Sequence, residues 1–185
     1  IDSCALSPDA LIVSLIDTDQ TIDDARLVRL YLAFFKRPPD PSGFAYWQRQ
    51  LDAGRGLINA ARNFAGSPEF ERTYGSLDNG EFVDLVYENV LDRGPDPSGR
   101  AFWVRRLDAR TNNRGEVMIN FSESPENLRL RTDAVTVFRM FRDMRLRFPS
   151  QSEFEALLDP IADETGTLEG AAFAVRTSQG DADRF

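Results

Sequence analysis

One stretch of sequence occurs twice and constrains the fold more than any other feature. Residues 37–47 read RPPDPSGFAYW, and residues 93–103 read RGPDPSGRAFW. Eight of the eleven positions hold the same residue at an offset of 56, and at a ninth Tyr46 is matched by Phe102. Agreement of this length at a single offset indicates an internal duplication, so the chain is expected to build the same local structure twice.

Each copy of this motif carries the signals of a helix start. Asp40 and its counterpart Asp96 directly precede a proline, and an acidic N-cap before a proline suits the free N–H groups of a helix end. Gly43 and Gly99 fall in the first turn, where helix propensity disfavours glycine, so we expect another helix to approach closely there. We assign a structural role to the motif residues Arg37, Pro39, Asp40, Gly43, Trp47, Arg93, Pro95, Asp96, Gly99 and Trp103.

Two kinds of side chain in the motif need separate interpretation. The arginine that opens each copy either pairs with the N-cap aspartate or covers the indole of the tryptophan. Phe44, Trp47 and Leu51 are spaced three and four apart, which favours a buried, structural indole. Tyr46 and Phe102 lie one step round the helix, so we expect them to be more exposed and to be the candidates for ligand binding.

Apolar residues at helical spacing recur along the chain and predict an all-α fold. We expect tandem helical repeats, two full units and a degenerate third, packed into one compact multi-helix domain. The expected boundaries are an N-terminal capping helix and acidic loop at 1–24, repeat one at 25–76, repeat two at 77–131, a degenerate capping repeat at 132–178 and a tail at 179–185.

The third copy has lost the Asp, Pro, Gly and Trp that define the motif. Residues 147–150 stand where the first copy begins, and Leu157 takes the place of Trp47. Further along, Phe173 stands near the place of Phe64. Terminal members of a repeat array diverge because one of their faces meets solvent, so a capping unit is the natural interpretation.

Composition removes several classes of function. The chain has no histidine and one cysteine, which leaves no zinc site and no internal disulfide, and we expect no metal and no cofactor. The net charge of −8 argues against a general affinity for nucleic acid or anionic membranes. Cys4 reads as an unpaired thiol, as one half of a bridge to a portion absent here, or as a lipid-attachment site. No apolar run approaches the ~20 residues of a transmembrane helix.

Acidic residues near the start of the chain resemble the opening of a calcium loop. They stand at alternate positions within residues 17–24. Ile22 and Val28, however, occupy the places of the required glycine and of the bidentate glutamate. A loop that leads into a helix N-cap at Thr21 or Asp23 is therefore the favoured interpretation.

The motif and its surroundings carry a family likeness. The pattern Arg-x-Pro-Asp-x-x-Gly-x-x-(Tyr/Phe)-Trp is followed in each copy by a Leu-Asp pair and by Phe-x-x-Ser-Pro-Glu, at 51–52 with 64–69 and at 107–108 with 121–126. It resembles the bacterial domain-of-unknown-function family 4214 and, more distantly, the helical linker domains of phycobilisomes. The likeness is strong over about residues 27 to 130 and weak over 135 to 177.

This resemblance implies an all-helical module of secreted or cell-surface bacterial proteins, often in tandem beside other domains, with no established enzymatic activity. We therefore expect a noncatalytic module that binds a protein or a cell-surface polymer, with attached domains of a larger protein as further partners. The first alternative is a carbohydrate or cell-wall binding module that uses Tyr46 and Phe102. The second is a glycan hydrolase whose carboxylate pair is Asp52 with Glu69 or Asp108 with Glu126.

Overall fold

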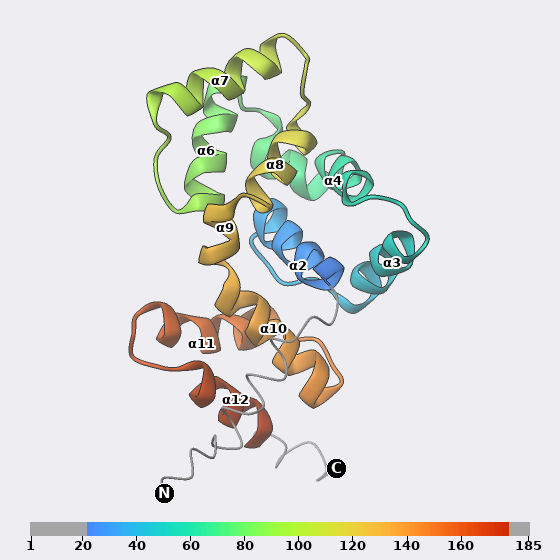
Figure 1. The fold of residues 1–185 in the computed structure, drawn as a ribbon, viewed down its shortest axis with the longest axis vertical. Coiled ribbons are helices and arrows are strands. Elements are labelled where there is room, and N and C mark those ends of the chain that lie inside the picture. Colours follow the sequence, from blue (N-terminus) through green and yellow to red (C-terminus); the bar gives the residue numbers. More distant parts are fainter. Residues whose placement is uncertain (1–21, 178–185) are drawn as a thin grey trace, which may run out of the picture. The chain divides into compact units, whose positions relative to one another are not determined.

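The computed structural model describes residues 22–177 (Figure 1). These residues form α-helices and one π-helical turn, with no strand among them, so the all-α prediction is confirmed. The helices are α2 (Ile22–Phe35), α3 (Pro41–Asp52), α4 (Leu57–Ala65), α5 (Pro68–Phe70) with the π turn η1 (Glu71–Gly75), α6 (Asn79–Leu91), α7 (Pro97–Asp108), α8 (Arg114–Ser122), α9 (Pro125–Leu130), α10 (Thr132–Arg145), α11 (Gln151–Ala162) and α12 (Leu168–Thr177).

Several predictions concern residues outside this range. Cys4, the expected N-terminal capping helix and the expected tail at 179–185 lie outside the described residues. Thr21 does as well, whereas Asp23 lies inside the first turn of α2, so Asp23 is not the N-cap.

The chain divides into two compact units between Arg131 and Thr132. The larger unit comprises residues 23–131, and the structure describes residues 132–177 of the C-terminal unit. The sequence predicts one compact domain. The third copy instead has its own core, because α10 packs against both α11 and α12.

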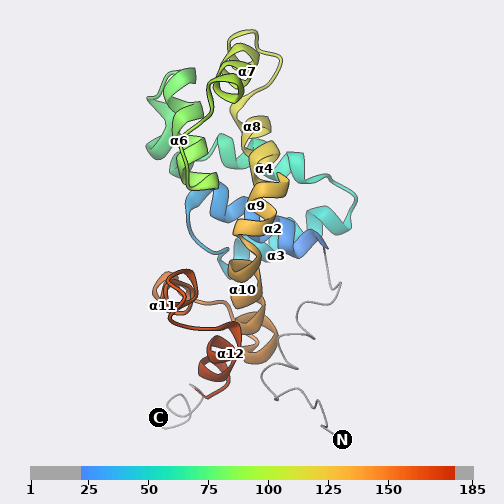
Figure 2. The same ribbon diagram turned by 60° about the vertical axis from the view of Figure 1, so that its left-hand side comes forward.

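The core of the larger unit lies where the third helices of the two full copies meet. Helices α4 and α8 make the most extensive packing contact in the unit, and they lie side by side in both views (Figure 1 and Figure 2). Helix α6 packs against α7, α8 and α9 around this pair. Side chains with at most 2% exposure make up the core of this unit, with contributions from α2, α5 and η1 as well: Leu27, Leu30, Phe34, Ala61, Phe70, Tyr74, Phe82, Val86, Val117 and Met118.

Residues with left-handed backbone recur at regular intervals along the described part of the chain. Between positions 22 and 177, five residues other than glycine, together with Gly54, have a positive φ. They form two series, Lys36, Asp92 and Leu146 after the first helix of each copy, and Gly54, Arg110 and Glu164 after the second. Successive members are 56 and then 54 positions apart in both series, and the two members within each copy are 18 positions apart. The left-handed residue ends a helix and turns the chain into the next segment, so the third copy has kept the turns although it has lost the motif.

The C-terminal unit keeps its core but not its aromatic content. Val137, Phe138 and Met140 on α10 and Ala172 on α12 are fully buried, and Val175 on α12 is almost so. Phe173 points outward and is 53% exposed. The prediction that Phe173 stands near the place of Phe64 therefore needs correction: the buried position belongs to Val175, which lies 54 residues after the buried Phe121.

Candidate interaction site

The motif aspartates cap their helices with the same geometry in both copies. Asp40 Oδ1 accepts hydrogen bonds from the Gly43 N–H at 2.8 Å and from the Ser42 hydroxyl at 2.7 Å. Asp96 Oδ1 accepts from Gly99 at 2.8 Å and from the Ser98 hydroxyl at 2.6 Å. Burial raises the pKa of Asp40, but these hydrogen bonds and the Arg37 charge outweigh burial, so the pKa lies below its usual value. Both carboxylates are engaged in starting α3 and α7.

The motif arginine makes a contact that neither sequence interpretation foresaw. Arg37 donates through Nε and Nη2 to both carboxylate oxygens of Glu69, at 2.8 and 3.0 Å. Its distance to the N-cap Asp40 is longer, at 3.7 Å, and its guanidinium lies 5.6 Å from the ring centre of Tyr31. Because Glu69 stands in the Ser-Pro-Glu segment, this pair ties the two recognisable segments of one copy together.

The second copy repeats this arrangement. Arg93 donates to both oxygens of Glu126 at 2.6 and 2.9 Å, and it lies 5.2 Å from the ring centre of Tyr87. Hydrogen bonds from the arginines lower the pKa of Glu69 and of Glu126. A general acid of a glycan hydrolase needs a raised pKa. The lowered pKa of each glutamate is the opposite of what that role requires.

The motif glycine makes room for a tyrosine hydroxyl. A methyl group added at Gly43 would collide with the hydroxyl of Tyr31 on α2, and one added at Gly99 would collide with that of Tyr87 on α6. The predicted close approach therefore comes from a side chain of the preceding helix. In the C-terminal unit the counterpart of the tyrosine is Phe141, which has no hydroxyl, and Glu153 stands in the place of the glycine.

The motif tryptophans are only partly buried, so the prediction of a buried indole is wrong. Trp47 touches Phe64 edge-on with ring centres 5.7 Å apart, and Trp103 lies 5.6 Å from Phe121. The reason lies in how α3 and α7 pack: each has a single buried residue, Phe44 in α3 and Leu107 in α7. The indoles therefore cover the edge of the core.

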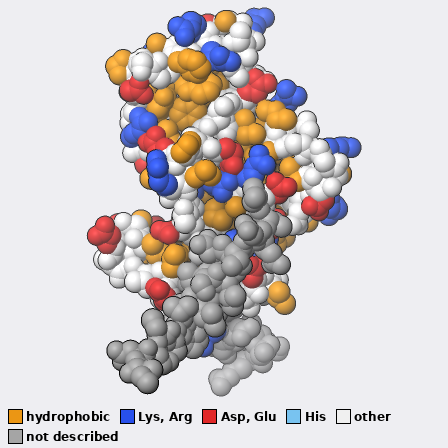
Figure 3. Space-filling view, in the orientation of Figure 1, with side chains coloured by type: hydrophobic (Ala, Val, Ile, Leu, Met, Phe, Trp, Pro, Cys, Tyr) orange, Lys and Arg blue, Asp and Glu red, His pale blue; other side chains and the backbone are white. Residues whose placement is uncertain are grey.

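The expected exposure of the neighbouring aromatic residues holds in both copies. Tyr46 is 47% exposed and Phe102 is 40% exposed. Each meets its tryptophan edge-on with ring centres 5.0 Å apart, at interplanar angles of 84° and 83°. In Figure 3, hydrophobic side chains gather at the surface over α7 and beside α6. We call Tyr46 with Trp47 and Phe102 with Trp103 the aromatic pairs.

One residue beside the second aromatic pair was not predicted from the sequence. The guanidinium of Arg106 lies 5.2 Å from the ring centre of Phe102. The signal is the spacing of four residues, which places both side chains on one face of α7. The first copy has Gln50 at this position, so the two pairs share their aromatic geometry but differ in charge.

Within the described residues, the structure has neither a cluster of metal-ligating side chains nor a membrane-spanning helix. Between positions 22 and 177, no group of three or more His, Cys, Asp or Glu side chains is arranged to hold a metal ion. In the same range, no helix has the length and apolar content needed to cross a bilayer.

The fold and the repeated capping geometry define an all-α protein built on a duplicated motif. Residues 61–131 match the sequence model of the family described as Domain of unknown function (DUF4214). The matched segment runs from α4 to the residue after α9, and it contains the second motif copy and Glu126. No curated protein and no solved structure matches the chain significantly.

Proposed function

We propose that the chain is a noncatalytic interaction module that binds another protein through its aromatic pairs. The observation that carries this proposal is that two aromatic pairs, each an exposed ring beside a partly buried tryptophan, occupy equivalent positions on α3 and α7 with the same edge-on geometry. Aromatic residues and arginine are enriched at the centres of protein interfaces, and Arg106 lies beside one of the pairs.

The motif's charged residues support a noncatalytic role. Asp40 and Asp96 cap helices, and the arginines of both copies are held by Glu69 and Glu126. These residues are explained by architecture, and a duplicated architecture has little need to repeat one catalytic site. We further propose that the module belongs to a secreted or cell-surface bacterial protein, as its resemblance to DUF4214 suggests.

The alternative is a carbohydrate or cell-wall polymer as the ligand. It is favoured by one specific observation: partly exposed tyrosine and tryptophan rings offer flat apolar faces, on which sugar rings stack. The two ligand classes use the same residues, so the experiment must separate them by the ligand and not by the mutation.

A binding comparison tests the proposal. The immobilised chain is incubated separately with surface proteins of the encoding organism and with its purified cell-wall polymer, using wild type, Tyr46→Ala/Phe102→Ala and Phe173→Ala. Phe173→Ala is the matched control because it removes an exposed aromatic ring that belongs to neither pair.

A specific protein retained by wild type and by the Phe173 variant, but lost from the double variant, supports the proposal. Retention of the polymer with the same mutational pattern supports the alternative. Equal retention by all three chains would contradict both.

A further inference from the structure

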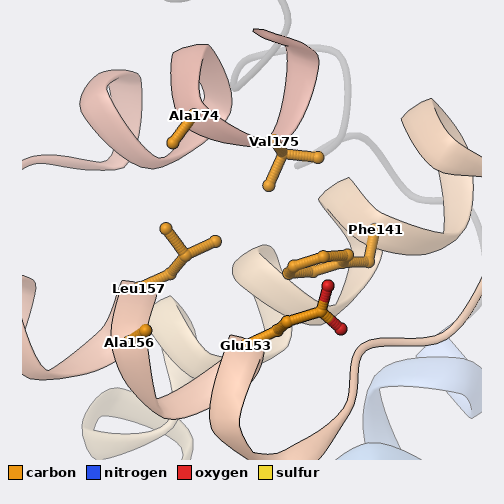
Figure 4. A pocket seen from close by; sticks show the side chains of 6 residues that line it. All are labelled: Phe141, Glu153, Ala156, Leu157, Ala174 and Val175. Carbon is orange, nitrogen blue, oxygen red and sulfur yellow. The ribbon is translucent and has the colours of Figure 1, made fainter. Parts of the chain in front are cut away.

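The C-terminal unit contains a cavity where the full copies have aromatic rings. Its volume is about 190 Å³, and Ala156 on its wall is exposed, so the cavity reaches the surface (Figure 4). The wall is apolar except for one carboxylate. The lining residues come from α10, α11 and α12: Phe141, Glu153, Ala156, Leu157, Ala174 and Val175.

The spacing of the copies identifies what these positions hold elsewhere. Leu157, Val175 and Phe141 each lie 54 residues after a residue of the second copy. This is the interval that separates the left-handed turn residues of the same two copies. The counterparts are aromatic without exception: Trp103 for Leu157, Phe121 for Val175 and Tyr87 for Phe141.

In the full copies these three rings pack against one another. Tyr87 meets Phe121 edge-on at 4.8 Å, and Trp103 lies 5.6 Å from Phe121. In the first copy, Phe64 makes the corresponding contacts with Tyr31 at 4.7 Å and with Trp47 at 5.7 Å.

In the third copy an indole and a phenyl ring are replaced by the branched aliphatic side chains of Leu157 and Val175. Both are smaller than the rings, and the left-handed turns that precede and follow α11 are retained. Figure 4 shows Leu157, Val175 and Phe141 around the open space, at the positions whose counterparts in the second copy carry the packed rings.

A cavity of this kind has a defined ligand chemistry. An enclosed apolar cavity of about 150 Å³ lined by aliphatic and aromatic side chains binds benzene, and the present cavity differs in being open to solvent on one side. A volume of about 190 Å³ accepts a somewhat larger ring system. Glu153 accepts hydrogen bonds from Arg147 and from the Ser150 backbone N–H, so its carboxylate is already satisfied without a cationic ligand.

We propose that this cavity binds an aromatic ring of indole size, which takes the place that Trp103 has in the second copy. The ring packs between Leu157, Val175 and Phe141 and enters past Ala156. The degenerate copy is thus a binding unit for a small aromatic group, and this site is separate from the aromatic pairs of the larger unit.

Titration of the full chain with indole tests the proposal. Wild type is compared with Leu157→Trp and Val175→Phe, which restore the rings of the full copies, and with Phe173→Ala as a control outside the cavity lining. Two filling variants are used so that the test survives if one of them does not fold.

We expect saturable binding of one indole to wild type and to the Phe173 variant, with a rise in melting temperature on adding indole. Each folded filling variant should bind indole at least tenfold more weakly. N-acetyl-tryptophanamide separates the sources of the ring: binding as tight as that of indole indicates a peptide side chain, and much weaker binding indicates a free small molecule. Absence of saturable indole binding to wild type, or equal affinity in a folded filling variant, would overturn the proposal.

Discussion

The pairing of Gly43 with the Tyr31 hydroxyl gives a quantitative prediction. Gly43→Ala adds a methyl group well inside the contact distance of that hydroxyl, and 2.9 Å from a carboxylate oxygen of Asp40. The tyrosine cannot move easily because its ring packs edge-on against Phe64 and Phe35. Overpacking of this kind costs about 1–3 kcal/mol, while the better helix propensity of alanine returns up to about 1 kcal/mol.

The prediction is therefore a coupling between two substitutions. Gly43→Ala should destabilise the wild-type chain by about 1 kcal/mol, and it should be neutral or stabilising in a Tyr31→Phe background, where the hydroxyl is absent. The coupling free energy between the two sites is expected to be about 2 kcal/mol. The added methyl group also meets the Asp40 carboxylate, and it does so in both backgrounds. The free-energy cost of moving that carboxylate therefore cancels from the coupling free energy.

Urea unfolding of the four chains, monitored by circular dichroism, measures this coupling. Gly66→Ala serves as the matched control, since its added methyl meets only ordinary contacts at 3.7 Å and should show no coupling to Tyr31→Phe. If Gly43→Ala has the same effect in both backgrounds to within about 0.5 kcal/mol, the tyrosine hydroxyl is not the reason for the glycine.

Three further predictions address the turns and ion pairs. Glu69→Gln should lower the free energy of unfolding by about 1 kcal/mol in urea, because it weakens the half-exposed bidentate pair with Arg37, and 1 M salt should shrink the difference. Leu146→Gly should raise the unfolding free energy by about 0.5–1 kcal/mol, since a left-handed backbone strains leucine and this side chain is 88% exposed; an unchanged or lower value would contradict this assignment. Hydrogen bonds from Arg147 lower the pKa of Glu153 to about 2 from its usual 4.5, so ionised Glu153 contributes stability above about pH 4.5 that is lost as the pH falls towards 2. Melting curves between pH 7 and pH 2.5 should be less pH-dependent in Glu153→Gln, and curves parallel to those of wild type would refute this role.

Local signals in the sequence predict much of the fold. Helices α3 and α7 begin at Pro41 and Pro97, as the Asp-Pro pairs predict, because an N-cap and the proline after it act within one turn. The Ser-Pro pair at Ser67 starts α5 in the same way. The left-handed turn residues, which most clearly relate the three copies, were not predicted. Glycine is the usual sequence signal for such a turn, and of these residues only Gly54 carries it.

The details of the candidate site depended on tertiary contacts that sequence patterns do not carry. Arg37 is held by a glutamate 32 residues further on, and only the packed helices bring the two together. The reason for Gly43 lies on another helix, in the hydroxyl of Tyr31. The helical spacing of Trp47 correctly points it towards the core, but the spacing does not show that α3 packs at the edge, where the ring stays partly exposed.

The central claim is that the aromatic pairs face a protein partner while the motif around them maintains the fold. Site-specific photocrosslinking tests it directly: a benzophenone amino acid replaces Tyr46, Phe102 or, as the control, Phe173, and each chain is irradiated with the surface proteins of the encoding organism. The account predicts the same protein adduct from positions 46 and 102 and no such adduct from position 173. Equal adducts at all three positions, or none at 46 and 102, would contradict it.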